Sequence, residues 1–167
     1  MKPELEKKFN DQTNELYASI GKACVKFELI CHGLRSAILQ MLGGDSFPRQ
    51  KIFQAVLAEL TAQPLLSIYQ ALIAETLDLT VDEKNIVNKL CKQVINLIER
   101  RNDIIHATWF VGYAGALDED FSRATGHKWK RGKDGAFLRS NTFEAKDFEG
   151  FASECDDVAN TVMFLPI

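Results

Sequence analysis

Three residues, Arg101, Asn102 and His106, carry side chains suited to phosphate chemistry. Arg presents a planar fork of N–H donors to phosphate oxygens, and the Asn amide adds a further donor. The His imidazole is a general acid or base near neutral pH. On a helix with about 100° per residue, Asn102 and His106 lie about 40° apart, with Arg101 flanking Asn102. The spacing therefore predicts one polar arc that meets a phosphodiester.

Two neighbouring charges are candidates for tuning this set. Asp103 is expected to pair with Arg100 or to act on the imidazole. A structural role is the alternative. In it, Arg101 and Asn102 cap the end of a helix or pair with Glu99 and Asp103, and His106 is a satisfied polar residue beside Trp109.

A basic stretch over residues 123–139 holds six Lys and Arg residues against one Asp. Because phosphate binding draws on clustered cations, this stretch is a candidate RNA-binding segment. The residues assigned to that role are Lys128, Trp129, Lys130, Arg131 and Lys133. Trp129 is expected to stack on an unpaired base. The alternative is a solvated hairpin in which the indole serves packing.

The composition predicts a soluble, cytoplasmic protein with a single domain over residues 1–167. The chain is 46% hydrophobic and 26% charged, which suffices for one hydrophobic core. No segment has the apolar length of a signal or a membrane span, so no membrane partner is expected. The four Cys residues form no C-x-x-C pair, which favours buried reduced thiols over disulfides or a metal site. The net charge of −3 argues against indiscriminate coating of nucleic acid.

Apolar residues at spacings of three and four predict helices along most of the chain. The expected helices cover about residues 5–41, 52–60, 65–77, 81–106 and 145–164. Pro64 is expected to kink the second helix or to split it from the third. Thr80 and Glu83 have the spacing of a capping box, so they should begin the helix that carries Arg101 near its C-terminal end.

The pattern changes to that of strands before the last helix. The expected strands are 109–113, 127–131 and 136–139, the last two joined by Gly132-Lys133-Asp134-Gly135. Residues 117–120 are expected to form a loop. We therefore predict a mainly α fold, an up-and-down bundle of four to five helices with a small β-hairpin insertion at about 109–139.

The order Arg101-Asn102, three residues and then His106 resembles the signature of HEPN domains, an Arg followed after four to six residues by a His. HEPN domains are helical bundles, mostly metal-independent ribonucleases, with this motif late in the helix order. The resemblance implies an endoribonuclease without cofactor or metal, which cleaves RNA by attack of the 2′-hydroxyl. His106 would move protons, Arg101 would hold the phosphate, and Asn102 would bind a phosphate oxygen or orient the imidazole. The strand insertion departs from the family pattern.

One imidazole cannot be both base and acid in a single in-line step, and HEPN ribonucleases typically meet this need by dimerising. The resemblance therefore implies a homodimer with a composite site, a role as a toxin or in antiviral defence, and an antitoxin or regulatory partner. The alternative is a non-catalytic HEPN-like helical module that binds RNA, a nucleotide or a partner protein. The complete set of Arg101, Asn102 and His106 favours the enzyme.

Overall fold

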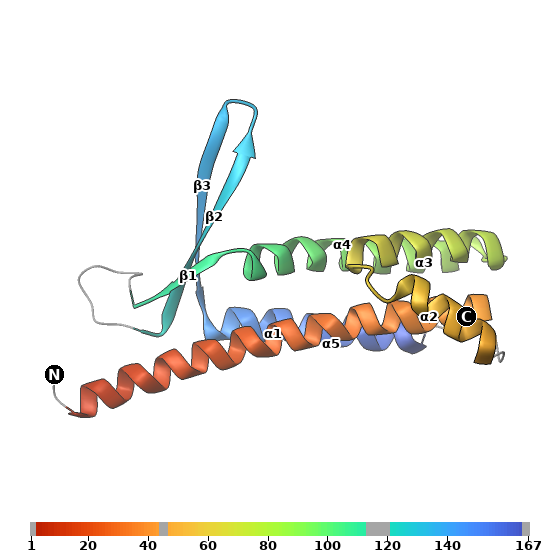
Figure 1. The fold of residues 1–167 in the computed structure, drawn as a ribbon. Helices are drawn as coiled ribbons and strands as arrows, with labels where there is room; N and C mark the ends of the chain where they lie inside the picture. The colour runs from red at the N-terminus through yellow and green to blue at the C-terminus, as the bar shows by residue number, and fades with distance from the viewer. Residues whose placement is uncertain (1–2, 44–46, 113–120, 165–167) are drawn as a thin grey trace. The chain divides into compact units, whose positions relative to one another are not determined.

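The structure is a computed structural model that describes residues 3–43, 47–112 and 121–164. This part of the chain is mainly helical, with five helices and a three-stranded antiparallel sheet before the last helix, which confirms the predicted class (Figure 1). The helices are α1 (Pro3–Gly43), α2 (Phe47–Leu57), α3 (Ala62–Thr76), α4 (Val81–Ile105) and α5 (Ala145–Phe164). The strands are β1 (Thr108–Val111), β2 (Arg123–Gly132) and β3 (Gly135–Glu144). The loop expected at 117–120 lies outside the described residues.

The chain forms two compact units. Unit 1 comprises Met1–Val25 and Arg100–Ser153, and unit 2 comprises Lys26–Glu99 and Glu154–Ile167. Each unit therefore contains a part of α1, α4 and α5. Unit 1 adds the sheet, and unit 2 adds α2 and α3.

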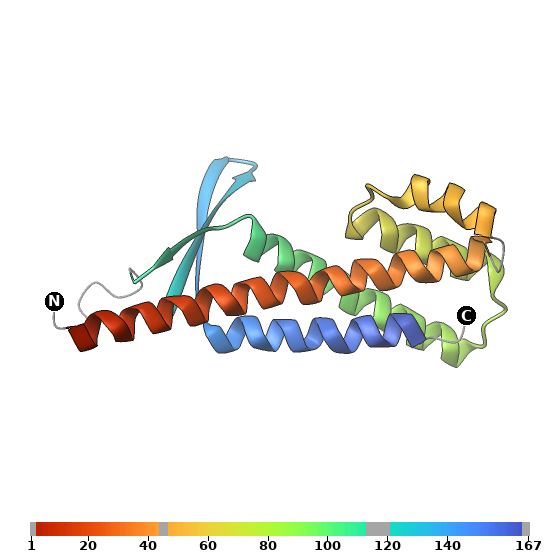
Figure 2. The ribbon, with the colours of Figure 1, turned by 60° about the horizontal axis from the view of Figure 1, so that its bottom comes forward.

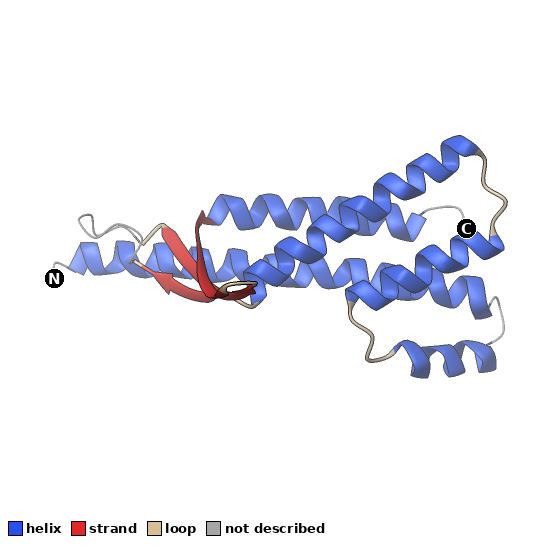
Figure 3. Ribbon diagram, turned by 90° about the horizontal axis from the view of Figure 1, so that it is seen from above, coloured by secondary structure: helices blue, strands red, loops and turns tan. Residues whose placement is uncertain are grey.

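Unit 2 is helical, and its core is built from apolar residues at helical spacing. Its fully buried large side chains are Phe27, Ile30, Leu34, Ile38, Leu65, Leu66, Tyr69, Val94 and Val162. Helices α2 and α3 run side by side in opposite directions (Figures 2 and 3). Pro64 lies in the first turn of α3, where its missing N–H costs no intrahelical bond, so the break falls at residues 58–61. Arg35 of α1 donates a 2.8 Å hydrogen bond to the carbonyl oxygen of Leu60 in that connection.

The predicted capping box begins α4. The Thr80 hydroxyl accepts a bond from the Glu83 backbone N–H at 3.4 Å. In return, the Glu83 carboxylate accepts bonds from the backbone N–H of Thr80 at 2.8 Å and from its hydroxyl at 2.7 Å. These bonds satisfy backbone donors that the first helical turn leaves without partners. They also hold the pKa of the Glu83 carboxyl below its usual value.

The sheet of unit 1 has the strand order β1-β2-β3 with antiparallel pairing throughout. The β2–β3 hairpin pairs from Arg123 opposite Glu144 to Gly132 opposite Gly135, so it is longer than the predicted hairpin. Gly135 has φ +120°, which an L residue rarely adopts, and this explains the glycine at the turn. Residues 131–140 are exposed, and the hairpin tip stands clear of the helical segments of unit 1 (Figure 1).

Cys31, Cys91 and Cys155 are buried, which agrees with the expected burial of the thiols, whereas Cys24 is half-buried. Burial raises the pKa of the Cys91 thiol, which lowers the fraction of the reactive thiolate. No helix in the described part of the chain is long and apolar enough to cross a membrane.

Candidate functional site at the end of helix α4

The three residues selected for phosphate chemistry lie at the C-terminal end of α4. Arg101 and Asn102 belong to its last turns and are half-buried, whereas His106 follows the helix directly and is exposed. Arg101 Nη1 donates a 3.3 Å hydrogen bond to Asn102 Oδ1. The backbone N–H of His106 donates to the carbonyl oxygen of Asn102 at 3.3 Å. This bond continues the helical pattern by one residue and keeps the imidazole one turn beyond Asn102.

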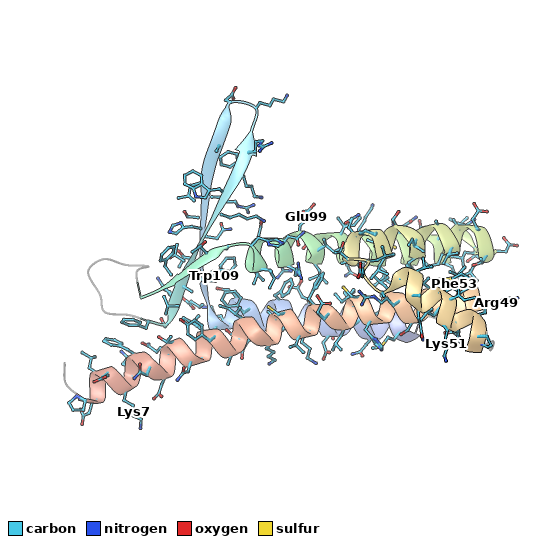
Figure 4. The ribbon with its side chains drawn as sticks, in the orientation of Figure 1. Lys7, Arg49, Lys51, Phe53, Glu99 and Trp109 are labelled. Carbon is cyan, nitrogen blue, oxygen red and sulfur yellow. The ribbon has the colours of Figure 1, made fainter. Side chains whose placement is uncertain are left out.

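Trp109 fixes the turn in which His106 lies. Its indole N–H donates a 2.8 Å bond to the carbonyl oxygen of Ile104, one of the last carbonyls of α4. Its ring lies edge-on to Phe143 and Phe148, with centroid distances of 5.6 and 5.3 Å. A Cβ on Gly126 would come within 2.9 Å of the indole, so only glycine leaves room for it in β2. In Figure 4 Trp109 lies at the base of the hairpin, where β1 leaves the helix end.

Asp103 forms an ion cluster with three cations of the sheet, which we call the Asp103 cluster. Its carboxylate oxygens lie 3.0 Å from Lys128 Nζ, 3.6 Å from Lys130 Nζ and 3.1 Å from Arg139 Nη1. Partial desolvation raises the pKa of Asp103, but the bond from Lys128 and the three positive charges outweigh it and hold the pKa below its usual value. Three cations against one carboxylate leave the cluster with a net charge of +2 beside Asn102.

Lys128 also caps α4, because its ammonium group donates a 2.9 Å bond to the carbonyl oxygen of Asn102. A cation at this end of a helix interacts favourably with the helix dipole, and here the Asn102 carbonyl accepts the ammonium in addition to the backbone N–H of His106. Lys128, proposed above as an RNA-binding residue, therefore holds the sheet to the helix end that carries the motif.

The other predicted residues divide between two places. Arg100 lies with its guanidinium 5.1 Å from the centroid of the Phe151 ring on α5. Trp129 is 72% exposed, and Arg131 and Lys133 are exposed at the hairpin tip. The structure thus brings Lys128 and Lys130 to Asp103, whereas Trp129, Arg131 and Lys133 remain at the surface.

Arg139 is the member of the cluster that the sequence analysis did not assign. It lies directly opposite Lys128 in the hairpin register, and directly opposed residues share one face of a sheet. Counting outward from the predicted turn would have placed both cations on that face.

A cavity of about 120 Å³ lies beside the cluster in unit 1. It is lined by Arg100, Asp103, Arg139 and Asn141 and by the rings of Phe143, Phe148 and Phe151, among others. Arg101, Asn102 and His106 do not line it. A larger cavity of about 460 Å³ lies in unit 2 between the end of α3 and the start of α4, and no motif predicted it. Within residues 3–43, 47–112 and 121–164, no group of three His, Cys, Asp or Glu residues could hold a metal ion.

No protein-family model, curated protein or solved structure matches this chain.

Proposed function

We propose that this protein is a metal-independent endoribonuclease that acts on RNA through Arg101, Asn102 and His106. One observation carries the proposal: these residues lie at the end of α4 directly beside the Asp103 cluster, which has a net positive charge. The only carboxylate in the sequence between Arg100 and His106 is Asp103, and its pairing with three cations offsets its repulsion of an RNA phosphate. The resemblance of the motif to that of HEPN ribonucleases supports the same chemistry.

The proposed reaction is a transesterification within the RNA chain. The 2′-oxygen attacks the adjacent phosphorus while its proton passes to the imidazole of His106. The bond from phosphorus to the 5′-oxygen breaks, and a second imidazole gives that oxygen a proton. The products are a 2′,3′-cyclic phosphate and a 5′-hydroxyl. Arg101 binds the phosphoryl oxygens, on which charge develops, and the Asn102 amide adds a donor.

The second imidazole would come from a second copy of the chain. His106 is exposed, so a partner's His106 can approach the same phosphate from the opposite side in a symmetric dimer. Ile105 next to it is 38% exposed, and an apolar side chain at that position is suited to an interface. Dimerisation would also supply the cleft that the open surface around the motif requires to exclude water.

The test is cleavage of purified cellular RNA in EDTA, with analysis of the product ends. We expect 2′,3′-cyclic phosphate ends from the wild type and none from Arg101→Ala or His106→Ala. His32→Ala and Arg49→Ala are matched controls, because both residues are exposed and lie in unit 2. Equal cleavage by His106→Ala and the wild type would overturn the proposal, as would the absence of cleavage by a folded dimer of the wild type.

A role as a toxin or in antiviral defence follows from the resemblance and is tested separately. Expression of the wild type should arrest growth, and expression of His106→Ala at the same level should not. An antitoxin or regulatory partner would be expected to relieve the arrest when co-expressed. An arrest that is equally strong with His106→Ala would show that toxicity does not come from this site.

A further inference from the structure

The sheet has two faces with different surroundings. Alternate side chains of a strand point to opposite faces, so the register assigns each residue to one of them. The inner face carries Trp109, Lys128 and Phe143, which contact Phe148 or Asp103 of the helices. We call the opposite face the outer face. From the base of the hairpin to its tip it carries Phe110, His127, Trp129, Leu138 and Arg131.

The outer face is internally bonded near its base. Arg123 pairs with Glu144 at 3.1 Å, and the hydroxyls of Thr125 and Thr142 lie 3.1 Å apart. His127 Nδ1 lies 2.7 Å from the Ser140 hydroxyl, and these bonds hold the two strands of the hairpin in register. The base of the outer face is therefore cross-linked between the two strands by side-chain bonds.

Large exposed apolar side chains lie along the outer face, with Phe110 at the base and Trp129 and Leu138 nearer the tip. Trp129 is 72% exposed, its cross-strand neighbour Leu138 is 45% exposed and Phe110 is 42% exposed. The ring of Phe110 lies 5.2 Å from that of His127, which precedes Trp129 by one position on the same face. Three exposed apolar side chains and an imidazole thus form one strip, and an exposed strip of this kind marks an interaction site.

The hairpin carries a net positive charge, although Lys128, Lys130 and Arg139 lie on its inner face at Asp103. Residues 123–144 carry six Lys and Arg against two Asp and Glu, a net charge of +4, whereas the whole chain has −3 and the remainder therefore −7. Arg131 follows Trp129 on the outer face, and Lys133 lies in the turn. Neither has an ion-pair partner within the described part of the chain. The hairpin is thus a positively charged segment of a chain whose remaining residues have a net negative charge.

We propose that the outer face of the hairpin binds single-stranded RNA, with bases stacked on Trp129 and Phe110 and phosphates bound by Arg131 and Lys133. Exposed rings interleaved with cations are the general means of binding an unpaired strand, because every base has a ring face and every nucleotide a phosphate. A duplex keeps its bases stacked on one another and offers none to Trp129. The choice of RNA over DNA rests on the proposed function, for which this surface would supply the substrate.

The experiment measures fluorescence anisotropy of a labelled 12-nucleotide RNA in EDTA. The His106→Ala background prevents cleavage during the measurement. We expect Trp129→Ala to weaken binding roughly 5- to 150-fold, the loss of one stacked base, and Trp129→Phe to restore most of it. Phe137→Ala is the matched control, because Phe137 is 52% exposed on the inner face of the same hairpin. Arg131→Ala should lower the slope of log affinity against log salt by about 0.7.

Two results would overturn the inference. One is RNA affinity that is unchanged in Trp129→Ala. The other is a duplex of the same sequence that binds as tightly as the single strand. If Trp129→Ala left RNA affinity unchanged but dissociated a dimer in sedimentation, the outer face would be a protein interface. If RNA binding requires Trp129 but the wild type does not cleave RNA, the binding proposal is supported and the ribonuclease proposal is overturned. The experiments therefore test the two proposals separately.

Discussion

The ammonium group of Lys128 lies 3.0 Å from the Asp103 carboxylate, and this contact joins strand β2 to the last turn of α4. The side chains of both residues are about three-quarters buried, with 22% and 24% exposed. The same ammonium donates to the carbonyl oxygen of Asn102, within the proposed catalytic set. One lysine thus determines how the sheet is attached to the helix end that presents Arg101, Asn102 and His106.

Lys128→Met should destabilise the fold by about 1.5–3 kcal/mol, the contribution of a hydrogen bond to a charged group. Lys130→Met is the matched control. Its ammonium lies 3.6 Å from Asp103 and is more exposed, at 35%, so its loss should cost less than about 0.5 kcal/mol. Urea unfolding of both variants and the wild type measures the difference. Equal losses from the two substitutions would show that the bond to Asn102 and the closer ion pair add nothing beyond what Lys130 contributes.

The Asp103 cluster also predicts how stability depends on pH. The pKa of Asp103 is lowered in the folded chain, so its contribution is complete above the unfolded value of about 3.9 and is lost as the pH falls through the lower folded value. Asp103→Asn cannot ionise and lacks this dependence. The difference in unfolding free energy between wild type and Asp103→Asn should be constant above about pH 5 and should shrink below about pH 4. A difference that grew on acidification would contradict the assigned direction.

Gly126 and Gly21 predict opposite outcomes for the same kind of substitution. Gly126→Val places a side chain against the Trp109 ring and should cost about 1–3 kcal/mol, with the tryptophan emission shifted to the red. A Cβ at Gly21 on α1 meets nothing within 4 Å, so Gly21→Ala should stabilise by about 0.5–1 kcal/mol. Thermal unfolding of both variants checks the signs. A neutral Gly126→Val would show that Trp109 does not lie across β2.

Local signals in the sequence were sufficient to predict the elements of this fold. The capping box at Thr80 and Glu83 depends only on residues three apart, and the structure has its bonds in both directions. Gly132 and Gly135 likewise predict the hairpin turn by residue type alone. The hairpin extends beyond the predicted residue 139, because Phe143 on β3 packs against Phe148 of α5. That contact is tertiary, and the polar residues around Phe143 give no strand signal by themselves.

The surroundings of the candidate site were harder to predict for the same reason. The sequence places Arg101, Asn102 and His106 at a helix end, which the structure confirms. The partners of Asp103 come from residues 25 to 36 positions away and depend on how the sheet docks. The sequence suggested Arg100 as the partner of Asp103 because it lies three positions away, whereas the docking of the sheet brings Lys128 and Arg139 to the carboxylate. Periodicity locates a face, but it does not show which element covers that face.

Thr80→Ala removes the hydroxyl that caps α4, and it should destabilise unit 2 by about 1 kcal/mol. Thr161→Ala is a suitable control, because the Thr161 hydroxyl only donates back to the carbonyl oxygen of Asp157 within α5. A bond of that kind adds little to a helix, so the control should change stability by less than about 0.5 kcal/mol. Urea unfolding at neutral pH followed by circular dichroism compares them. A control that lost as much as Thr80→Ala would assign the effect to the methyl-bearing side chain rather than to the cap.

Mixing wild type with His106→Ala distinguishes a composite site from two independent sites. If each cleavage needs one imidazole from each protomer, only dimers of two wild-type chains are active. In a fully exchanged mixture with a ninefold excess of His106→Ala, activity per wild-type chain should then fall about tenfold. His32→Ala in the same excess should not inhibit, since it leaves the motif intact. Activity that stays proportional to the wild-type chain under exchange would mean that one His106 suffices, and a different proton donor for the 5′-oxygen would have to be sought within the same protomer.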